Sequence, residues 1–245
     1  MQDWESRLAH LRIERLRPKQ IEAALALRSM VYIPLGALEY HGHHLPIGLD
    51  AMTAHGLCLQ ACEQTGGLVM PPLYYGMTGS IGHHPWTICV EKEETLKQLY
   101  LDTLNRLSDF GIEQAVLFTG HFGRRQMALM AELQNEWDAN ASSLRLKCLS
   151  ISDLPGVAMP GDHGALFETS VLAQLHPDRV HLNELPDQTE FPANDPDGDS
   201  WGAHRRDPEN VLFGILGDDP RDYQPEQAQA LTQALLKGVV ELVEA

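Results

Sequence analysis

The chain is short of positive charge: 18 Lys and Arg residues face 34 Asp and Glu residues, which gives 245 residues a net charge of −16. This excess argues against nucleic-acid binding, which needs a basic surface to contact phosphates. It also disfavours docking on an anionic membrane surface. Because no run of about 18 apolar residues is present, we expect no transmembrane helix. The expected partner is therefore a small molecule.

Cysteine is scarce as well. Cys58, Cys62, Cys89 and Cys148 form no CxxC pair and no regular framework, so we expect buried thiols in a reducing compartment. The first seven residues are charged and lack the apolar stretch of a secretory signal. These features predict a cytoplasmic protein.

Short apolar runs alternate with helical patterns along the chain. We expect strands at 30–35, 87–90, 115–118 and 144–151, with an extended segment at 68–75. We expect helices at 4–16, 18–28, 92–110, 124–137, 164–175 and 225–243, and one that Asp50 caps and that ends at 66–67. This alternation predicts a single domain over 1–245, an α/β/α sandwich with a mostly parallel sheet. Such sheets bind ligands at the carboxyl ends of their strands.

The segment 186–210 is rich in Asp, Pro and Gly. It is long for a loop inside a compact domain. We therefore interpret it as either a lid over the site or a mobile excursion.

A cluster of acidic and histidine side chains follows the first predicted strand. Glu39 and His41 lie two residues apart, so in an extended segment they point to the same side. Asp50 follows, with His43 and His44 between. Carboxylates and imidazoles in a Gly/Pro-rich loop suit a borderline divalent metal such as Zn²⁺, Mn²⁺ or Fe²⁺. The alternative is a His-rich surface loop, and the clustering of all three residue types favours the metal site.

Two further segments carry candidate residues. His121 lies between two glycines after a strongly apolar strand, where it either joins a site or caps the next helix. Glu168 lies five residues after His163 on a mostly apolar helix. An unpaired buried carboxylate is costly, so Glu168 needs a cation partner. That partner is either a metal or simply an arginine.

These segments together resemble a known family. PLGALEYHGHHLPIGLD (34–50) closely resembles the creatininase (creatinine amidohydrolase) signature, in which Pro-x-Gly-Ser-x-Glu-Gln-His-Gly-x-His-Leu-Pro leads to an Asp. TGHFG (119–123) resembles the family's Asn-Gly-His-Gly-Gly, and DHGALFETS (162–170) resembles its His-Ala-Gly-x-x-Glu-Thr-Ser. GSIGHHPWTI (79–88) resembles a shortened fourth block. All four occur in the family's order.

The resemblance implies an α/β/α fold, a homo-oligomer that is usually a hexamer, and two divalent metal ions per subunit. The family's own second carboxylate falls at Gly123 here, so Glu168 is the natural replacement. The implied ligands are Glu39, Asp50 and His121 for one metal, and His41, Asp50 and Glu168 for the other, with Asp50 bridging.

The resemblance also implies a reaction. A hydroxide that bridges the metals attacks an amide or cyclic amide carbonyl, and His163 is the catalytic residue that moves protons. Other members remove formyl groups from pyrimidine intermediates, trim a cofactor precursor peptide or open oxidised cyclitol rings. An inactive metal-binding scaffold is the alternative outside enzymes. No GxGxxG or Walker A motif is present, so a nucleotide-binding protein is disfavoured.

Departures from the family pattern point to the substrate pocket. Thr119 replaces the usual Asn, and we expect Trp86, Phe122 and Arg124 to line an altered pocket that binds substrate. An arginine there suits a substrate carboxylate or phosphate. Alternatively, Arg124 and Arg125 simply pair with the many acidic residues.

Overall fold

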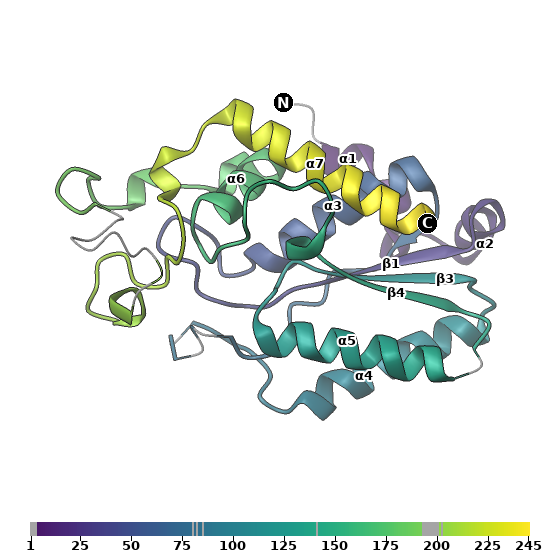
Figure 1. The fold of residues 1–245 in the computed structure, drawn as a ribbon. Coiled ribbons are helices and arrows are strands. Elements are labelled where there is room, and N and C mark those ends of the chain that lie inside the picture. The colour runs from purple at the N-terminus through teal and green to yellow at the C-terminus, as the bar shows by residue number, and fades with distance from the viewer. Residues whose placement is uncertain are drawn as a thin grey trace.

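The computed structural model describes residues 4–79, 81, 83–84, 86–140, 142–192, 201 and 203–245. Within them, parallel strands form one sheet in the order β2-β1-β3-β4, with helices on both faces (Figure 1). This confirms the predicted α/β/α sandwich with a parallel sheet. The strands are β1 (Met30–Leu35), β2 (Leu68–Val69), β3 (Gln114–Thr119) and β4 (Arg145–Ser150).

The helices divide between the two faces of the sheet (Figure 1). One face carries α3 (Leu49–Thr65), α6 (Leu166–Leu175) and α7 (Pro225–Glu244), and the other carries α4 (Glu93–Asp109) and α5 (Arg124–Ala139). Two shorter helices, α1 (Trp4–Arg7) and α2 (Pro18–Leu27), lie near the start of the chain. Short 3₁₀ helices are Ala9–Leu11, Ile13–Arg15, Ile151–Asp153, Pro177–Arg179, Leu182–Glu184, Ala203–Arg206 and Pro220–Asp222.

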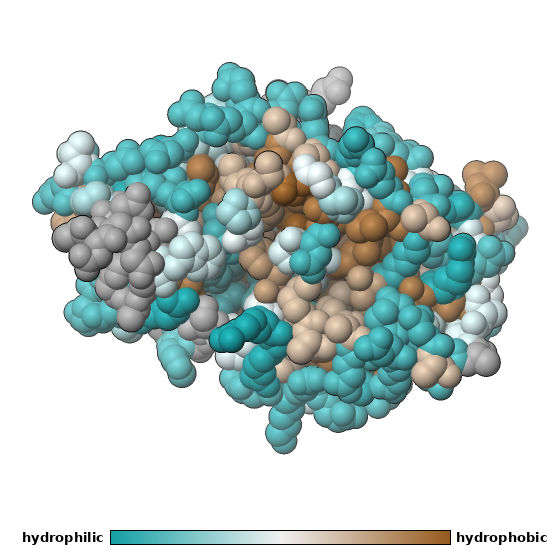
Figure 2. All heavy atoms as spheres, viewed as in Figure 1, coloured by the Kyte–Doolittle hydropathy of each residue, from teal (hydrophilic) through white to brown (hydrophobic). Residues whose placement is uncertain are grey.

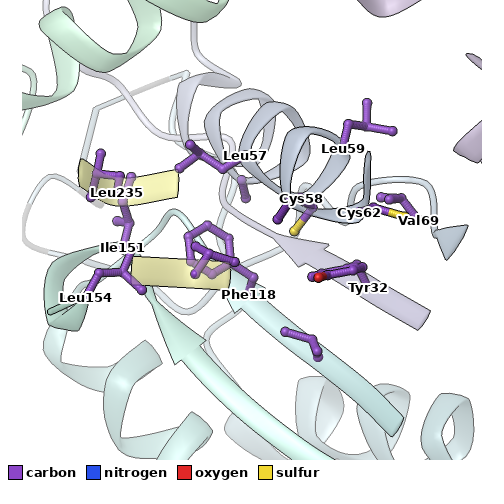
Figure 3. Close-up of a cluster of buried hydrophobic side chains, with 14 of the residues drawn as sticks. Tyr32, Leu57, Cys58, Leu59, Cys62, Val69, Phe118, Ile151, Leu154 and Leu235 are labelled. Atoms are coloured by element: carbon purple, nitrogen blue, oxygen red, sulfur yellow. The ribbon is translucent and has the colours of Figure 1, made fainter. Parts of the chain in front are cut away.

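The two central strands separate two apolar cores. Every residue of β1 and β3 is buried, as expected for strands covered by helices on both faces. Because successive strand side chains point to opposite faces, Tyr32 and Phe118 pack with α3, α6 and α7 (Figure 3). Ile33 and Leu117 pack with α4 and α5 instead. The apolar runs in the sequence therefore hold the sheet between its helix layers.

The edge strand β4 is partly open between α5 and α7, where apolar side chains gather on the surface (Figure 2). A hollow of about 320 Å³ lies there, lined in part by Met127, Leu149 and Leu242. The Gln134 amide covers the strand's backbone, because its Nε2 donates to the Leu146 carbonyl and its Oε1 accepts from the Cys148 N–H. Such cover limits pairing with another chain.

Two glycines bring the strand ends against the first turn of α3. A Cβ at Gly36, which follows β1, would lie 2.1 Å from the backbone nitrogen of Ala51. A Cβ at Gly120, which follows β3, would lie 2.2 Å from the carbonyl oxygen of Asp50. No larger residue fits such distances, so these glycines place Asp50 beside the loops at the carboxyl ends of β1 and β3.

Two sequence predictions near the sheet edge are wrong. The helix expected over 4–16 ends at Arg7, and the chain then bends so that Arg12 bridges Val69 in parallel at the edge of the sheet. The strand expected over 87–90 forms only single bridges, from Ile88 to Leu38 and from Val90 to Met77. Its two partners lie in separate loops, so no continuous ladder forms.

Asp50 is not the cap of α3. The helix begins at Leu49 after Gly48, and no side chain caps it. Asp50 lies in the first turn, and its carboxylate faces two histidines instead of the helix backbone. The predicted end of this helix at 66–67 is confirmed by the cap residue Gly66.

The four cysteines are all free. The predicted burial is confirmed for Cys58 and Cys62, whereas Cys89 and Cys148 are partly exposed. No helix among the described residues is long and apolar enough to cross a membrane.

Candidate metal centre

Side chains from four separate segments meet at the carboxyl ends of the strands. Five of these residues form two groups that could each hold a metal ion. Each residue offers one ligand atom, and the ligand atoms of one group lie within 4.8 Å of one another. Asp50 belongs to both groups, and every member is at most 5% exposed. The structure thus brings together the five residues that the resemblance implies as ligands, in the same division. These two groups are Glu39 with Asp50 and His121, and His41 with Asp50 and Glu168; a third possible group joins Glu39 and His41 to the partly buried His163.

Backbone carbonyls orient both histidines of these groups. His41 Nδ1 lies 2.8 Å from the carbonyl oxygen of Glu39, and His121 Nε2 lies 2.9 Å from that of Met77. A carbonyl oxygen only accepts, so these nitrogens carry the proton. In the neutral rings, His41 Nε2 and His121 Nδ1 therefore present lone pairs. This is the arrangement that fixes a metal-binding imidazole.

The lone-pair nitrogens face carboxylate oxygens. His41 Nε2 lies 3.1 Å from Asp50 Oδ1 and 3.5 Å from Glu168 Oε2. His121 Nδ1 lies 3.1 Å from Asp50 Oδ2 and 3.2 Å from Glu39 Oε2. The two oxygens of Asp50 thus face different histidines. Lone pairs at such distances repel unless a positive charge lies between them.

Buried polar atoms of this cluster lack hydrogen-bond partners among the described residues. They include both carboxylate oxygens of Glu39, both of Asp50, and Nε2 of His41. Leaving ionised carboxylates buried and unpaired is costly. Three carboxylates and two imidazoles are a donor set that Zn²⁺, Mn²⁺ and Fe²⁺ accept. The residues present therefore fit divalent metal ions, with Asp50 able to reach two of them.

The cluster shifts the pKa values of its own members. Burial alone would lower the pKa of His41, but the carboxylates of Asp50 and Glu168 raise it to about 10. Asp50 and Glu39 keep low pKa values despite burial, because imidazoles lie beside them. Burial raises the pKa of Glu168 well above its usual value. The site therefore attracts positive charge, as protons or as metal ions.

His163 lies beside this cluster. Its ring centre is 4.3 Å from that of His41, and its Nε2 lies 2.9 Å from the carbonyl oxygen of Tyr40. Its backbone exchanges two hydrogen bonds with Leu216, at 2.9 and 2.7 Å. Burial and the neighbouring His41 lower the pKa of His163 to about 4. A neutral His163 with Nε2 donating has Nδ1 as a proton acceptor.

The start of α6 holds Glu168 in place. Asp162 accepts hydrogen bonds from the backbone N–H groups of Phe167 and Glu168, at 2.6 and 3.2 Å. Glu168 Oε2 accepts from the N–H of Gly164 at 2.6 Å. Gly164 has φ +60°, and a Cβ there would lie 2.7 Å from the carbonyl oxygen of His41. The turn that carries His163 therefore packs directly on the His41 backbone.

A cavity of about 470 Å³ opens above the cluster. Of the three residues predicted to bind substrate, Phe122 and Arg124 line it. Trp86 is not among the described lining residues, and its side chain is 68% exposed. In the fourth block, residues 80, 82 and 85 lie outside the described residues. Phe122 and Arg124 therefore lie on the wall of this cavity, and the role of all three residues in binding substrate stays a prediction.

The cavity wall also includes residues that the sequence did not single out. Trp201 and Arg206 come from the segment interpreted as a lid, of which 193–200 and 202 lie outside the described residues. The sequence signal that could have identified them is an aromatic and a basic side chain within a stretch rich in Asp, Pro and Gly. Further lining residues, without a sequence signal of their own, are Thr78, Gly161 and Leu216.

Arg124 and Arg125 both line the cavity but have different surroundings. Arg125 donates to a carboxylate oxygen of Glu91 at 3.2 Å and to its backbone carbonyl at 2.6 Å. Arg124 makes no hydrogen bond or ion pair with any residue in the described part of the chain. Pairing with acidic residues, the alternative left open by the sequence, thus explains Arg125 and not Arg124.

The fold and the site define a class: an α/β protein whose strand ends carry a buried carboxylate–histidine cluster suited to divalent metals. The family model for creatininase, creatinine amidohydrolase, matches residues 14–243. The chain therefore belongs to the creatininase family.

Individual relatives agree. Creatinine amidohydrolase of Pseudomonas putida is 30% identical over 92% of this chain and 93% of its own. The mycofactocin precursor peptide peptidase of Mycolicibacterium smegmatis is 29% identical over 64% of this chain and 62% of its own. A solved structure named "Creatininase Mn" has 25% identity and a TM-score of 0.73, covering 95% of this chain and 97% of that one. The chain is thus a creatininase-family hydrolase.

Proposed function

We propose that this chain uses two divalent metal ions to hydrolyse an amide or cyclic amide C–N bond of a small molecule. The observation that carries the proposal is the position of Asp50. One of its oxygens lies 3.1 Å from His41 Nε2, and the other lies 3.1 Å from His121 Nδ1. Asp50 is the residue shared by the group with Glu39 and His121 and the group with His41 and Glu168, so we assign it as the bridge between the two ions.

The five buried side chains have separate tasks in this proposal. Glu39 and His121 complete one ion's ligand set, and His41 and Glu168 complete the other's. When bound, such ions lower the pKa of water and offset negative charge that develops on a carbonyl oxygen. Burial of these five side chains lowers the local dielectric constant, which strengthens the electrostatic interactions of the ions with water and substrate.

His163 moves the proton. Its Nε2 donates to the Tyr40 carbonyl at 2.9 Å, which leaves Nδ1 as the acceptor for a proton of the attacking water. The protonated ring then gives that proton to the departing nitrogen. Hydrogen bonds between the backbones of His163 and Leu216 hold the ring in position throughout.

Two relatives support the choice of bond. One is an amidohydrolase and the other a peptidase by name, and both kinds of enzyme cleave a C–N bond of a carbonyl group. The name "Creatininase Mn" supports manganese as one metal to supply. Metal ions at this site would stabilise the oxyanion formed from any such carbonyl group. The side chains of the cavity wall must therefore select the substrate.

The test is a substrate panel with defined metal content. Protein stripped by chelator and reloaded with Mn²⁺ or Zn²⁺ is assayed with creatinine, a formylated aminopyrimidine, short peptides and an oxidised cyclitol. We expect hydrolysis of an amide only in the reloaded protein. Cyclitol ring opening alone would contradict the bond assignment. Retention of metal without hydrolysis of any probe would support the inactive metal-binding scaffold, and failure to retain metal would contradict the proposal.

We also propose a homo-oligomer, a hexamer, and a cytoplasmic location, as the family resemblance implies. Sedimentation equilibrium gives the mass of the assembly directly. A monomeric mass near 27.3 kDa would contradict the oligomer.

A further inference from the structure

Arg124 is a cation on the wall of the cavity with no acidic partner among the residues that the structure describes. It lines the same cavity as Glu39, His121 and Glu168. It makes no hydrogen bond or ion pair with any residue that the structure describes. The chain has 34 acidic and 18 basic residues, so acidic partners are available in excess.

Arginines elsewhere in the chain show the usual outcome. Arg28 pairs with Glu244 at 3.1 Å and Arg221 with Asp219 at 2.8 Å. Arg125, the next residue in the chain, is held by Glu91. Arg145 bonds only Gln114, so an arginine without an acidic partner is not unique among the described residues; what distinguishes Arg124 is its place on the cavity wall.

The backbone around Arg124 adds positive potential to this wall. Arg124 is the first residue of α5, whose first turn has no acidic residue and whose N-cap, Gly123, offers no side chain. The positive end of the helix dipole therefore opens at the cavity with Arg124. The part of the wall around Arg124 thus favours an anion.

We infer that Arg124 binds an oxyanion, a carboxylate or a phosphate, on the substrate, so that the substrate is an anionic amide. This inference rests on the proposed function, because it assigns the amide to the metal cluster and the oxyanion to Arg124. The guanidinium presents N–H donors in a planar fork that matches two oxygens of a carboxylate or phosphate. Arg124 determines specificity and takes no part in bond cleavage.

The test measures binding to the zinc-loaded protein and does not require turnover. The probes are succinamate and succinamide, which differ in one terminal carboxylate, and 3-phosphonopropionamide. We expect wild-type protein to bind an anionic probe more tightly than succinamide, by about tenfold to a hundredfold. In Arg124→Gln this preference disappears, while succinamide binding is unchanged. The anionic probe that loses more affinity identifies the oxyanion.

Arg125→Gln is the matched control, since its guanidinium is held by Glu91. It should retain the wild-type preference. Equal binding of charged and neutral probes by wild-type protein would overturn the inference. A preference that survives in Arg124→Gln would also overturn it, because the carboxylate would then bind the metals. Zinc content and a melting curve confirm that both variants fold. A protein that shows the preference but hydrolyses no amide would refute the proposed function alone.

Discussion

The floor below the cavity, formed by the five candidate metal ligands, and the cavity wall, which includes Phe122, Arg124 and Trp201, are built in opposite ways. On the floor, each histidine is oriented by a backbone carbonyl, and Asp50 is fully buried. On the wall, Arg124 is exposed and has no partner among the described residues, and Trp201 is 49% exposed. The floor is thus preorganised for fixed ligands. The exposed side chains of the wall can contact a particular substrate.

This difference indicates that the metal-ligand motif can stay the same while the cavity wall, and with it the substrate, changes. The floor residues belong to the loops that follow β1 and β3 and to the first turns of α3 and α6, so the fold itself places them. The wall residues Phe122 and Arg124 depart from the family pattern. Changes on the floor should therefore destroy function, whereas changes on the wall should redirect it.

The largest effect should come from Asp50→Asn. It removes the carboxylate that belongs to both ligand groups. Because metal ions contribute several kcal/mol of charge stabilisation in the transition state, we expect loss of both metals and at least about a thousandfold slower turnover. Elemental analysis and kinetics measure this. Asp109→Asn, at an aspartate whose side chain is 67% exposed, is the control. An active Asp50→Asn protein with full metal content would refute the site.

His163→Ala separates proton transfer from metal binding. We expect turnover to fall by about 10²–10⁴-fold, the usual contribution of general acid–base catalysis, with metal content unchanged. His181→Ala, at an exposed histidine, should change neither quantity. If metal were lost with His163, that histidine would be a ligand and not a proton carrier.

Acid should weaken metal binding. Neighbouring carboxylates raise the pKa of His41 to about 10 and that of His121 well above its usual value, so both rings are protonated at neutral pH without metal. Each metal must displace a proton, so affinity should rise up to about tenfold per pH unit for each proton released. Competition with a chelator at pH 6, 7 and 8 measures the slope. A flat profile would contradict the charge arrangement.

The same protonation affects folding with the opposite sign. The raised pKa of His41 stabilises the metal-free fold fully below pH 6.5, and this contribution is lost as the pH rises through about 10. The melting temperature of metal-free protein should therefore fall over this window while metal affinity rises. A melting temperature that rises steadily across it would contradict this account.

The smallest effect should come from Gly120→Ala. Its Cβ would lie 2.2 Å from the Asp50 carbonyl, so α3 must shift, at a cost of about 1–3 kcal/mol of stability. Metal affinity should fall as well. Gly111→Ala is the control, because Gly111 has φ +76° and no atom within 4 Å of the added Cβ. It should lower stability through backbone strain and leave metal binding intact.

Local patterns in the sequence predicted the parallel sheet, and the family resemblance predicted which five side chains the fold brings together. Metal binding by these side chains stays a prediction. The runs of β1 and β3 are continuously apolar, and the Glu39, His41 and Asp50 segment carries its chemistry within twelve residues. The first helix ends at Arg7, and Arg12 then bridges Val69, a contact distant in the chain that the local pattern does not reveal. Likewise, no spacing in the sequence reveals that Arg124 lacks a partner among the described residues, because this depends on the three-dimensional arrangement of its neighbours.

The most direct test of the account is a crystal structure of zinc-loaded protein with anomalous scattering data. The account predicts two peaks on either side of Asp50, one contacting Glu39 and His121 and the other contacting His41 and Glu168. A single peak, or peaks away from Asp50, would contradict it.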